Sequence, residues 1–207
     1  ILLYHFRDQW DNQIMLYLSA SCVCWLLMFV RLPLYRTDAR PDASYRSVSF
    51  ATAIVSITTG WFALSWLRIQ PEGSWLILLL LLIVWAADTG AYFAGKAFGK
   101  RKLTPLISPG KTREGLLGGL IAAIVMALLA SKLMPLADIG LIYLFLLGLI
   151  TTLVSAGGDL MISLHKRTSG CKDSGNLLPG HGGILDRLDS LLAAAPFFAL
   201  GLLLIGY

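Results

Sequence analysis

WLILLLLLIVWAADTGAYFAG, residues 75–95, is an apolar run with a single charged side chain, Asp88. A helix needs roughly 20 predominantly apolar residues to cross the hydrocarbon core of a bilayer, and this run has that length. It therefore predicts a membrane-spanning helix that carries one carboxylate in its second half.

Further apolar runs lie on both sides of this segment. In addition to 75–95, we predict spanning helices at about residues 14–30, 48–67, 115–135, 139–164 and 190–206. The chain is 57% hydrophobic and 14% charged, whereas a water-soluble domain is about a quarter charged. The predicted fold class is all-α: residues 1–207 form a single transmembrane domain, a polytopic integral membrane protein with about six transmembrane helices. The chain begins at Ile1 within an apolar run, so we expect it to be N-terminally truncated.

Lys and Arg are distributed unevenly between the loops. Of the 17 Lys and Arg residues, 14 lie in the loops after the first, third and fifth predicted spans or directly before the last span. Positive residues accumulate on the cytoplasmic side of membrane proteins, so these three loops are predicted to be cytoplasmic. Because the basic residues occur in loops, and not on a basic helix interleaved with aromatics, nucleic acid is not an expected partner.

Half of the acidic residues gather on the same side. They belong to the cytoplasmic ends of spans or to the adjoining loops, and they are Asp88, Glu114, Asp159, Asp173, Asp186 and Asp189. An ionisable residue in or beside a spanning segment is a functional-site candidate. This side of the membrane is therefore where we expect the chemistry.

Three of these carboxylates have a spacing that favours a cation site. Asp159 is followed one helical turn later by Ser163, and Asp186 and Asp189 are three residues apart, so on a helix both project to one side. Hard divalent cations prefer carboxylate oxygens. We interpret Asp159, Asp186 and Asp189 as metal ligands. The alternative is a set of salt bridges with the basic residues at the same helix ends, Lys166, Arg167 and Arg187.

Asp88 is the acid placed most deeply in a predicted span. One interpretation is a buried carboxylate that is hydrogen-bonded to a neighbouring span. The other is a group that positions substrate or binds a metal. The small residues around it permit close helix packing, which suits both interpretations.

The segment SPGKTREG (108–115) contains GKT but is not a Walker A loop. Pro105 occupies the position where that motif needs glycine, and no strand is expected before it. The segment opens an apolar helix, whose free N–H groups together with Lys111 and Arg113 would favour a phosphate. The alternative is a plain loop at the membrane surface.

The segment HKRTSGCKDSGNLLPGHGG (165–183) is the loop richest in glycine, which allows close approach of backbone to a ligand. Lys166, Arg167 and Lys172 offer charge for phosphates. His181 is a candidate general base or phosphate donor, or a residue that stabilises the loop by hydrogen bonding. Cations, glycines and carboxylates on one membrane face suggest metal-assisted chemistry on a phosphate-bearing substrate, with a lipid as the second substrate.

SLHKRTSGCKDSGNLLPGHGGILDRLD (163–189) resembles the signature of the phosphatidate cytidylyltransferase family, also called CDP-diacylglycerol synthases. The shared pattern is a serine, Lys-Arg, Lys-Asp, His-Gly-Gly and Asp-Arg-x-Asp. DTGAYFAGKAFGK (88–100) and SPGKTREGLLGG (108–119) are similar to upstream blocks of that family. Residues 1–80 match only in hydrophobicity. His165 is a departure, because the family usually has an apolar residue before Lys-Arg.

This resemblance implies transfer of a cytidylyl group from CTP to phosphatidic acid, giving CDP-diacylglycerol and pyrophosphate for phospholipid biosynthesis. It implies Mg²⁺ as the cofactor and leaves a second cation open. Residues 1–80 would then be variable N-terminal spans and 81–207 the catalytic spans and loops. The implied catalytic residues are Asp159, Lys166, Asp186 and Asp189, of which the three aspartates would hold the metal. The implied substrate-binding residues are Asp88, Ser108, Lys111, Ser163, Arg167, Lys172, Asp173, His181 and Arg187.

The same resemblance places the protein in the bacterial inner (cell) membrane with its active site facing the cytoplasm, among membrane lipids, and leaves a homodimer open. Two other functions are weighed against it. A CTP-dependent lipid kinase of the polyprenol type would share the nucleotide and the membrane setting. A transporter would have its acids distributed across the membrane, whereas these acids cluster near one side.

Overall fold

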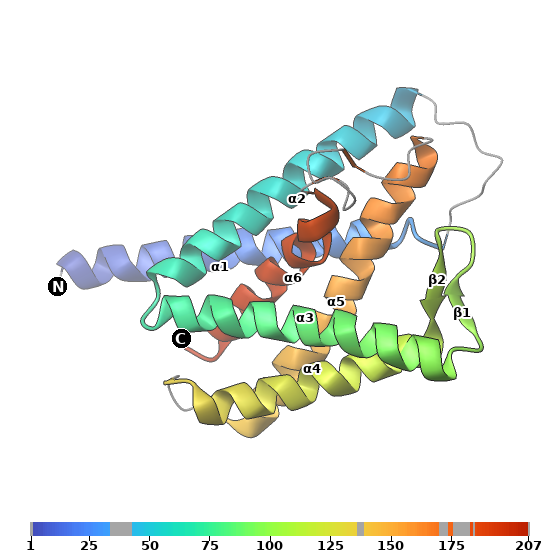
Figure 1. Cartoon of the computed structure of the whole chain (residues 1–207). Coiled ribbons are helices and arrows are strands. Elements are labelled where there is room, and N and C mark those ends of the chain that lie inside the picture. Colours follow the sequence, from blue (N-terminus) through green and yellow to red (C-terminus); the bar gives the residue numbers. More distant parts are fainter. Residues whose placement is uncertain are drawn as a thin grey trace.

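A computed structural model describes residues 2–33, 43–135, 139–169, 174–175, 183 and 185–206. Within these ranges the chain forms six long helices and one short β-hairpin (Figure 1). The elements in chain order are α1 (Leu2–Phe29), α2 (Ala43–Ile69), α3 (Gly73–Phe98), β1 (Lys102–Thr104), β2 (Ser108–Thr112), α4 (Arg113–Leu133), α5 (Leu141–Thr168) and α6 (Leu185–Leu204).

All six helices are long and apolar enough to cross a membrane, which confirms the predicted fold class and the predicted spans. Successive helices run in alternating directions, so the start of α1 and the end of α6 lie at the same end of the bundle (Figure 1). The hairpin lies at the opposite end, which we call the hairpin end. The difference in boundaries that bears on the site is at α6, which begins at Leu185, five residues before the predicted start. Asp186 and Asp189 therefore lie within the first turns of α6.

The β1–β2 hairpin is a feature that the sequence patterns did not predict. Its strands have only three and five residues, and they pair antiparallel with Lys102 opposite Thr112 and Thr104 opposite Ser108. Strands this short lack the alternation of polar and apolar residues that marks longer ones. The segment that contains GKT is thus a strand, β2, and not an irregular surface loop.

Hydrogen bonds attach this hairpin to the start of α4. The Glu114 carboxylate accepts hydrogen bonds from the backbone N–H groups of Lys100 and Arg101 at 3.1 and 3.2 Å, and the Arg113 N–H donates to the Arg101 carbonyl at 2.9 Å. The Thr112 hydroxyl accepts from the Gly115 N–H at 3.1 Å, as an N-cap does. Two N–H groups of the first turn are therefore occupied within the protein, which does not favour the predicted phosphate at this helix start.

Helices α3 and α4 form the most extensive helix pair in the bundle. At their contact, a Cβ added to Gly90 would lie 2.8 Å from the Gly118 carbonyl oxygen, and one added to Gly118 would lie 3.1 Å from the Gly90 carbonyl oxygen. Small residues let membrane helices approach closely enough for van der Waals packing of their backbones. The two helices form a closely packed pair that carries the hairpin at one end.

Helix α6 lies in the middle of the bundle and contacts α1, α2, α3 and α5 (Figure 1). Four side chains on the contact face of its second half are fully buried: Ala195, Phe198, Ala199 and Leu202. Because the neighbouring helices surround α6, the position of its first turn at the hairpin end is set by packing along its whole length.

The contact between α3 and α4 can be tested with Gly118→Val. We expect this variant to lose about 1–3 kcal/mol of unfolding free energy, because a larger side chain overpacks a tight contact. Thermal or denaturant unfolding in detergent measures this loss. Gly110→Ala is the matched control, because an added Cβ at Gly110 meets no atom within 4 Å. Equal unfolding free energies of the two variants would contradict a close contact between α3 and α4 at Gly118.

Candidate active site

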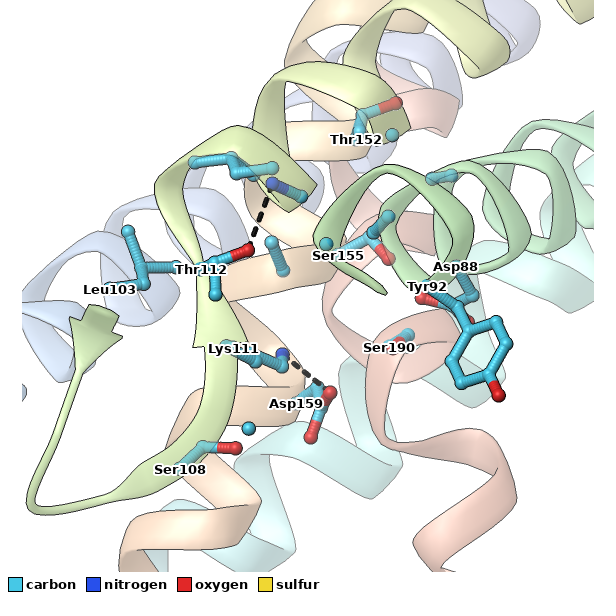
Figure 2. A pocket seen from close by; sticks show the side chains of 18 of the residues that line it. Asp88, Tyr92, Leu103, Ser108, Lys111, Thr112, Thr152, Ser155, Asp159 and Ser190 are labelled. Carbon is cyan, nitrogen blue, oxygen red and sulfur yellow. Dashed lines mark hydrogen bonds and ion pairs between the residues drawn. The ribbon is translucent and has the colours of Figure 1, made fainter. Parts of the chain in front are cut away.

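A cavity of about 690 Å³ lies at the hairpin end, lined by residues of α3, the hairpin, α4, α5 and α6. Its lining on α5 extends from Thr152 to Lys166, a distance of roughly 20 Å along the helix axis. Figure 2 shows this cavity from close by, with the side chains of Lys111 and Asp159 directed toward each other in its lining. The cavity thus extends from the hairpin end deep into the helical bundle.

Three helices each contribute one carboxylate to the cavity: Asp88 from α3, Asp159 from α5 and Asp189 from α6. Asp159 and Asp88 both interact electrostatically with Asp189, and Asp88 also interacts with Asp159. A close approach of α5 and α6 explains part of this grouping, since a Cβ added to Gly158 would lie 2.9 Å from the Asp189 carbonyl oxygen. Three like charges are therefore held near one another beside a cavity, where only cations can balance them.

Lys111 supplies one of these cations from β2. Its ammonium group forms an ion pair with Asp159 Oδ2 at 2.5 Å, and the Ser163 hydroxyl donates to Asp159 Oδ1 at 3.3 Å (Figure 2 shows the ion pair). The Lys111 and Asp159 side chains are 27% and 29% exposed, so both remain accessible from the cavity. The hairpin thus delivers a positive charge to the carboxylates of the spanning helices.

Asp186 lies in the first turn of α6 and has a different set of partners. It accepts a hydrogen bond from the Lys166 ammonium group at 2.8 Å through Oδ1. Its Oδ2 accepts from the backbone N–H groups of Ser174 and Gly183 at 2.9 and 3.0 Å. Asp186 therefore joins the end of α5 and two points of the glycine-rich segment to the start of α6.

Carboxylates of this kind suit a hard divalent cation, which binds oxygen ligands. Within the described residues, however, no three His, Cys, Asp or Glu side chains lie close enough together to hold one ion. The three predicted ligands line the same cavity, but Lys111 is paired with Asp159 and Lys166 with Asp186. Asp88 is the third carboxylate in electrostatic contact with Asp159 and Asp189. The assignment of Asp159, Asp186 and Asp189 as metal ligands stays a prediction.

The remaining predicted residues divide into three groups. Ser108 lines the cavity from β2 (Figure 2). Arg167 and Arg187 are exposed, and the Arg167 Nε donates to the Ile107 carbonyl at 3.3 Å, so Arg167 fastens the hairpin to the end of α5. The third group lies outside the described residues: Lys172, Asp173 and His181.

Sequence reasoning missed several polar residues that line the inner part of the cavity. Thr152 and Ser155 on α5 are 2% and 1% exposed, and Ser190 follows Asp189 on α6. The Thr152 hydroxyl donates to the Gly148 carbonyl at 2.7 Å, and the Ser190 N–H donates to Asp189 Oδ1 at 2.7 Å. A signal was present, because Thr152, Ser155 and Asp159 recur at the three-to-four-residue spacing of one helix face.

His165 is not part of the cavity lining. Both of its ring nitrogens are buried and have no hydrogen-bond partner among the residues that the structure describes. The departure from the expected sequence pattern thus lies beside the site and not within it.

Known proteins resemble this chain along most of its length. The sequence profile of the Cytidylyltransferase family matches residues 1–205. A phosphatidate cytidylyltransferase of Haemophilus influenzae is 52% identical over 131 residues, which is 62% of this chain and 46% of the relative. One of Pseudomonas aeruginosa is 49% identical over 146 residues (70% of this chain, 54% of the relative), and one of Bacillus subtilis is 48% identical over 130 residues (63% and 48%).

The chain spans about half the length of these curated relatives. The matching profile covers the first helices as well as the helices that build the cavity. The carboxylates, lysines and hairpin described above thus lie within the matched region, and the chain belongs to the cytidylyltransferase family.

Proposed function

We propose that this protein transfers a cytidylyl group from CTP to phosphatidic acid, giving CDP-diacylglycerol and pyrophosphate. The observation that carries the proposal is the cavity at the hairpin end, in which carboxylates from α3, α5 and α6 lie with Lys111 and Lys166. Membership of the cytidylyltransferase family and the names of the relatives support the nucleotide and the lipid as substrates.

The carboxylates of this cavity fit a hard divalent cation by their donor chemistry. Mg²⁺ is usually bound by one or two carboxylates together with waters and substrate phosphates. We propose that Asp159 and Asp189 would hold Mg²⁺ in this cavity, with Asp186 and Asp88 as the other candidate carboxylates. When bound, such an ion would neutralise phosphate charge and polarise the α-phosphorus of CTP.

The lysines bind and stabilise the phosphates. Lys111 and Lys166 reach the cavity from β2 and from the end of α5, so their ammonium groups approach it from two different elements. An ammonium group that donates to a phosphate oxygen forms a charge-assisted hydrogen bond. Held in place before the reaction, these charges stabilise the negative charge that develops on the leaving pyrophosphate.

The reaction itself is an in-line displacement. A phosphate oxygen of phosphatidic acid forms a bond to the α-phosphorus of CTP while the bond from that phosphorus to the oxygen bridging to the β-phosphorus breaks. Pyrophosphate leaves with the bonding electron pair. Because the attacking phosphate is already anionic at neutral pH, no strong general base is needed, and the task of the protein is to position the two substrates.

The uneven distribution of Lys and Arg between the loops supports an orientation of the bundle in the membrane. The hairpin and the neighbouring loops carry most of the Lys and Arg residues, which favours a cytoplasmic location for this end of the bundle. We propose that the cavity opens to the cytoplasm from the inner membrane of a bacterium, where CTP is available.

The reaction can be tested with the full-length protein in mixed micelles containing phosphatidic acid, Mg²⁺ and CTP labelled at either the α- or the γ-phosphate. We expect the α-label to appear in the lipid product and the γ-label in pyrophosphate. Transfer of the γ-label to lipid would instead indicate a lipid kinase. Uptake of substrate into proteoliposomes without CTP turnover would indicate a transporter.

The carboxylates can be tested with Asp159→Asn and Asp189→Asn. Each variant keeps the size of the side chain but removes a charge, so we expect kcat to fall by about 100-fold or more while membrane insertion is unchanged. Glu72→Gln is the matched control, because Glu72 lies between α2 and α3 at the other end of the bundle. Near-normal turnover of either aspartate variant would reject its assignment.

Lys111→Ala tests the contribution of the hairpin. We expect kcat/KM for CTP to fall by about 10-fold or more, the loss of one hydrogen bond to a charged group. Lys132→Ala, at the exposed end of α4 away from the hairpin, is expected to leave this value unchanged. If both variants behave alike, Lys111 does not contact the nucleotide.

A further inference from the structure

One part of the cavity lining also belongs to the outer surface of the bundle. Tyr92 and Lys96 line the cavity from α3, yet both are exposed, and the Lys96 ammonium group lies 6.0 Å from the centre of the Tyr92 ring. Figure 2 shows Tyr92 next to Asp88, with its ring directed away from the Lys111–Asp159 ion pair. These two residues therefore mark a place where the cavity reaches the outer surface of the helical bundle. We call it the α3 mouth, defined by Tyr92 and Lys96.

Lys96 differs from the other cations of the cavity in its partners. Of the three lysines in the described lining, Lys111 and Lys166 form ion pairs with Asp159 and Asp186. Lys96 has no carboxylate within ion-pair distance among the described residues, and its ammonium group lies over the Tyr92 ring. An aromatic ring attracts a cation without neutralising it. The α3 mouth thus offers a positive charge that an anion can bind.

The surroundings of the α3 mouth are apolar and aromatic. Trp85 and Phe93 on α3 are 57% and 64% exposed. On a spanning helix, exposed apolar side chains face acyl chains, and aromatic residues concentrate where the hydrocarbon meets the headgroups. Lys96 is in the last turn of α3, where a lysine places its charge at headgroup level. An anion that reaches Lys96 from this side would therefore be part of a lipid.

The packing of α3 leaves room for such an approach. Helix α3 packs closely along α4, but its contacts with α6 are few. Both helices contribute lining residues to the cavity, among them Asp88 and Asp189. Up to Ala87, α3 shares a buried apolar core with α6, whereas Asp88, Tyr92 and Lys96 beyond it are exposed. The α3 side of this seam is therefore uncovered only toward the hairpin end.

Asp88, Tyr92 and Lys96 follow one another at four-residue intervals along one face of α3. Over this stretch the helix advances about 12 Å, from the last turn of the helix to the carboxylates of the cavity. The nucleotide phosphates, in contrast, have Lys111 and Lys166 on β2 and α5 as ligands. The cavity therefore has two separate cationic places, one on the hairpin side and one on the membrane side.

We propose that Lys96, supported by the Tyr92 ring, binds the phosphate monoester of an anionic phospholipid that reaches the cavity from the bilayer between α3 and α6. The acyl chains lie against the exposed aromatic surface of α3. This inference rests on the proposed function, because it assigns the lipid substrate to the α3 mouth and leaves CTP at Lys111 and Lys166. Lys96 is in this sense a substrate-positioning residue.

The test uses the full-length protein and its Lys96→Ala and Lys96→Arg variants in detergent micelles. At saturating CTP, the mole fraction of dioleoyl phosphatidic acid is varied; at saturating lipid, CTP is varied. For Lys96→Ala we expect the KM for the lipid to rise by about 10-fold, the loss of one hydrogen bond to a charged group, with the KM for CTP unchanged. Lys96→Arg keeps the charge and is expected to retain most of the lipid affinity.

Further variants at Lys100 and Tyr92 distinguish a specific effect of the α3 mouth on lipid binding from an effect of surface charge in general. Lys100→Ala removes an exposed cation from the same end of the bundle, outside the cavity lining, and we expect it to change neither KM. Tyr92→Leu is expected to raise the KM for the lipid, whereas Tyr92→Phe keeps the ring and does not. An equal effect of Lys96→Ala and Lys100→Ala, or a rise in the KM for CTP alone, would overturn the proposal.

A binding measurement keeps this inference separate from the proposed reaction. In phosphatidylcholine nanodiscs, added phosphatidic acid should raise the Tm of the wild-type protein and of Lys100→Ala, but not of Lys96→Ala. Soluble glycerol 3-phosphate should not raise the Tm of any of these proteins. If it raised the Tm as much as phosphatidic acid does, the site would bind free phosphate, and access from the bilayer would be overturned. Absence of turnover in the wild type would reject the proposed function. A rise in the Tm of Lys96→Ala equal to that of the wild type would reject the role of Lys96.

Discussion

The close contact between α3 and α4 is the constraint on which the rest of the site depends. Because neither Gly90 nor Gly118 has a side chain, the two backbones meet directly and form a firm wall. That wall carries the hairpin, which Glu114 and Thr112 fasten to the start of α4. The hairpin in turn brings Lys111 to Asp159 on α5. A contact between two uncharged residues within the spanning helices therefore determines where a charge lies at the end of the bundle.

Charge balance explains the arrangement of the remaining groups. Carboxylates placed at the edge of a membrane are costly unless cations compensate them. Lys111 and Lys166 each compensate one aspartate. Asp88 and Asp189 both interact electrostatically with Asp159, but neither has an ion pair of its own among the described residues. The site thus retains unbalanced negative charge inside and positive charge at the α3 mouth. Such a distribution suits a cation deep in the cavity and anionic groups at its edges.

The sequence predicted features that depend on local properties and missed those that depend on three-dimensional contacts. The length of an apolar run is local, so all six spans were predicted correctly. Strands of three and five residues have no readable alternation, so the β1–β2 hairpin was not expected. Several of the predicted site residues, including Asp88, Lys111 and Asp159, do line one cavity. In contrast, the pairing of Lys166 with Asp186 depends on how the ends of α5 and α6 meet, and the outward position of Tyr92 depends on which face α4 covers. Neither can be read from spacing alone.

The hydrogen bonds of Asp186 to Ser174 and Gly183 have a consequence for how the glycine-rich segment can change during evolution. One carboxylate closes a ring of ten residues by holding both of its ends. The entropic cost of closing such a ring increases only with the logarithm of its length. Inserting a residue or two between these ends would therefore lower the stability of the fold very little. A strict spacing of the residues in between would then reflect the shape of a bound substrate. Comparing the length of this segment between family members would therefore separate selection by the ligand from selection by the fold.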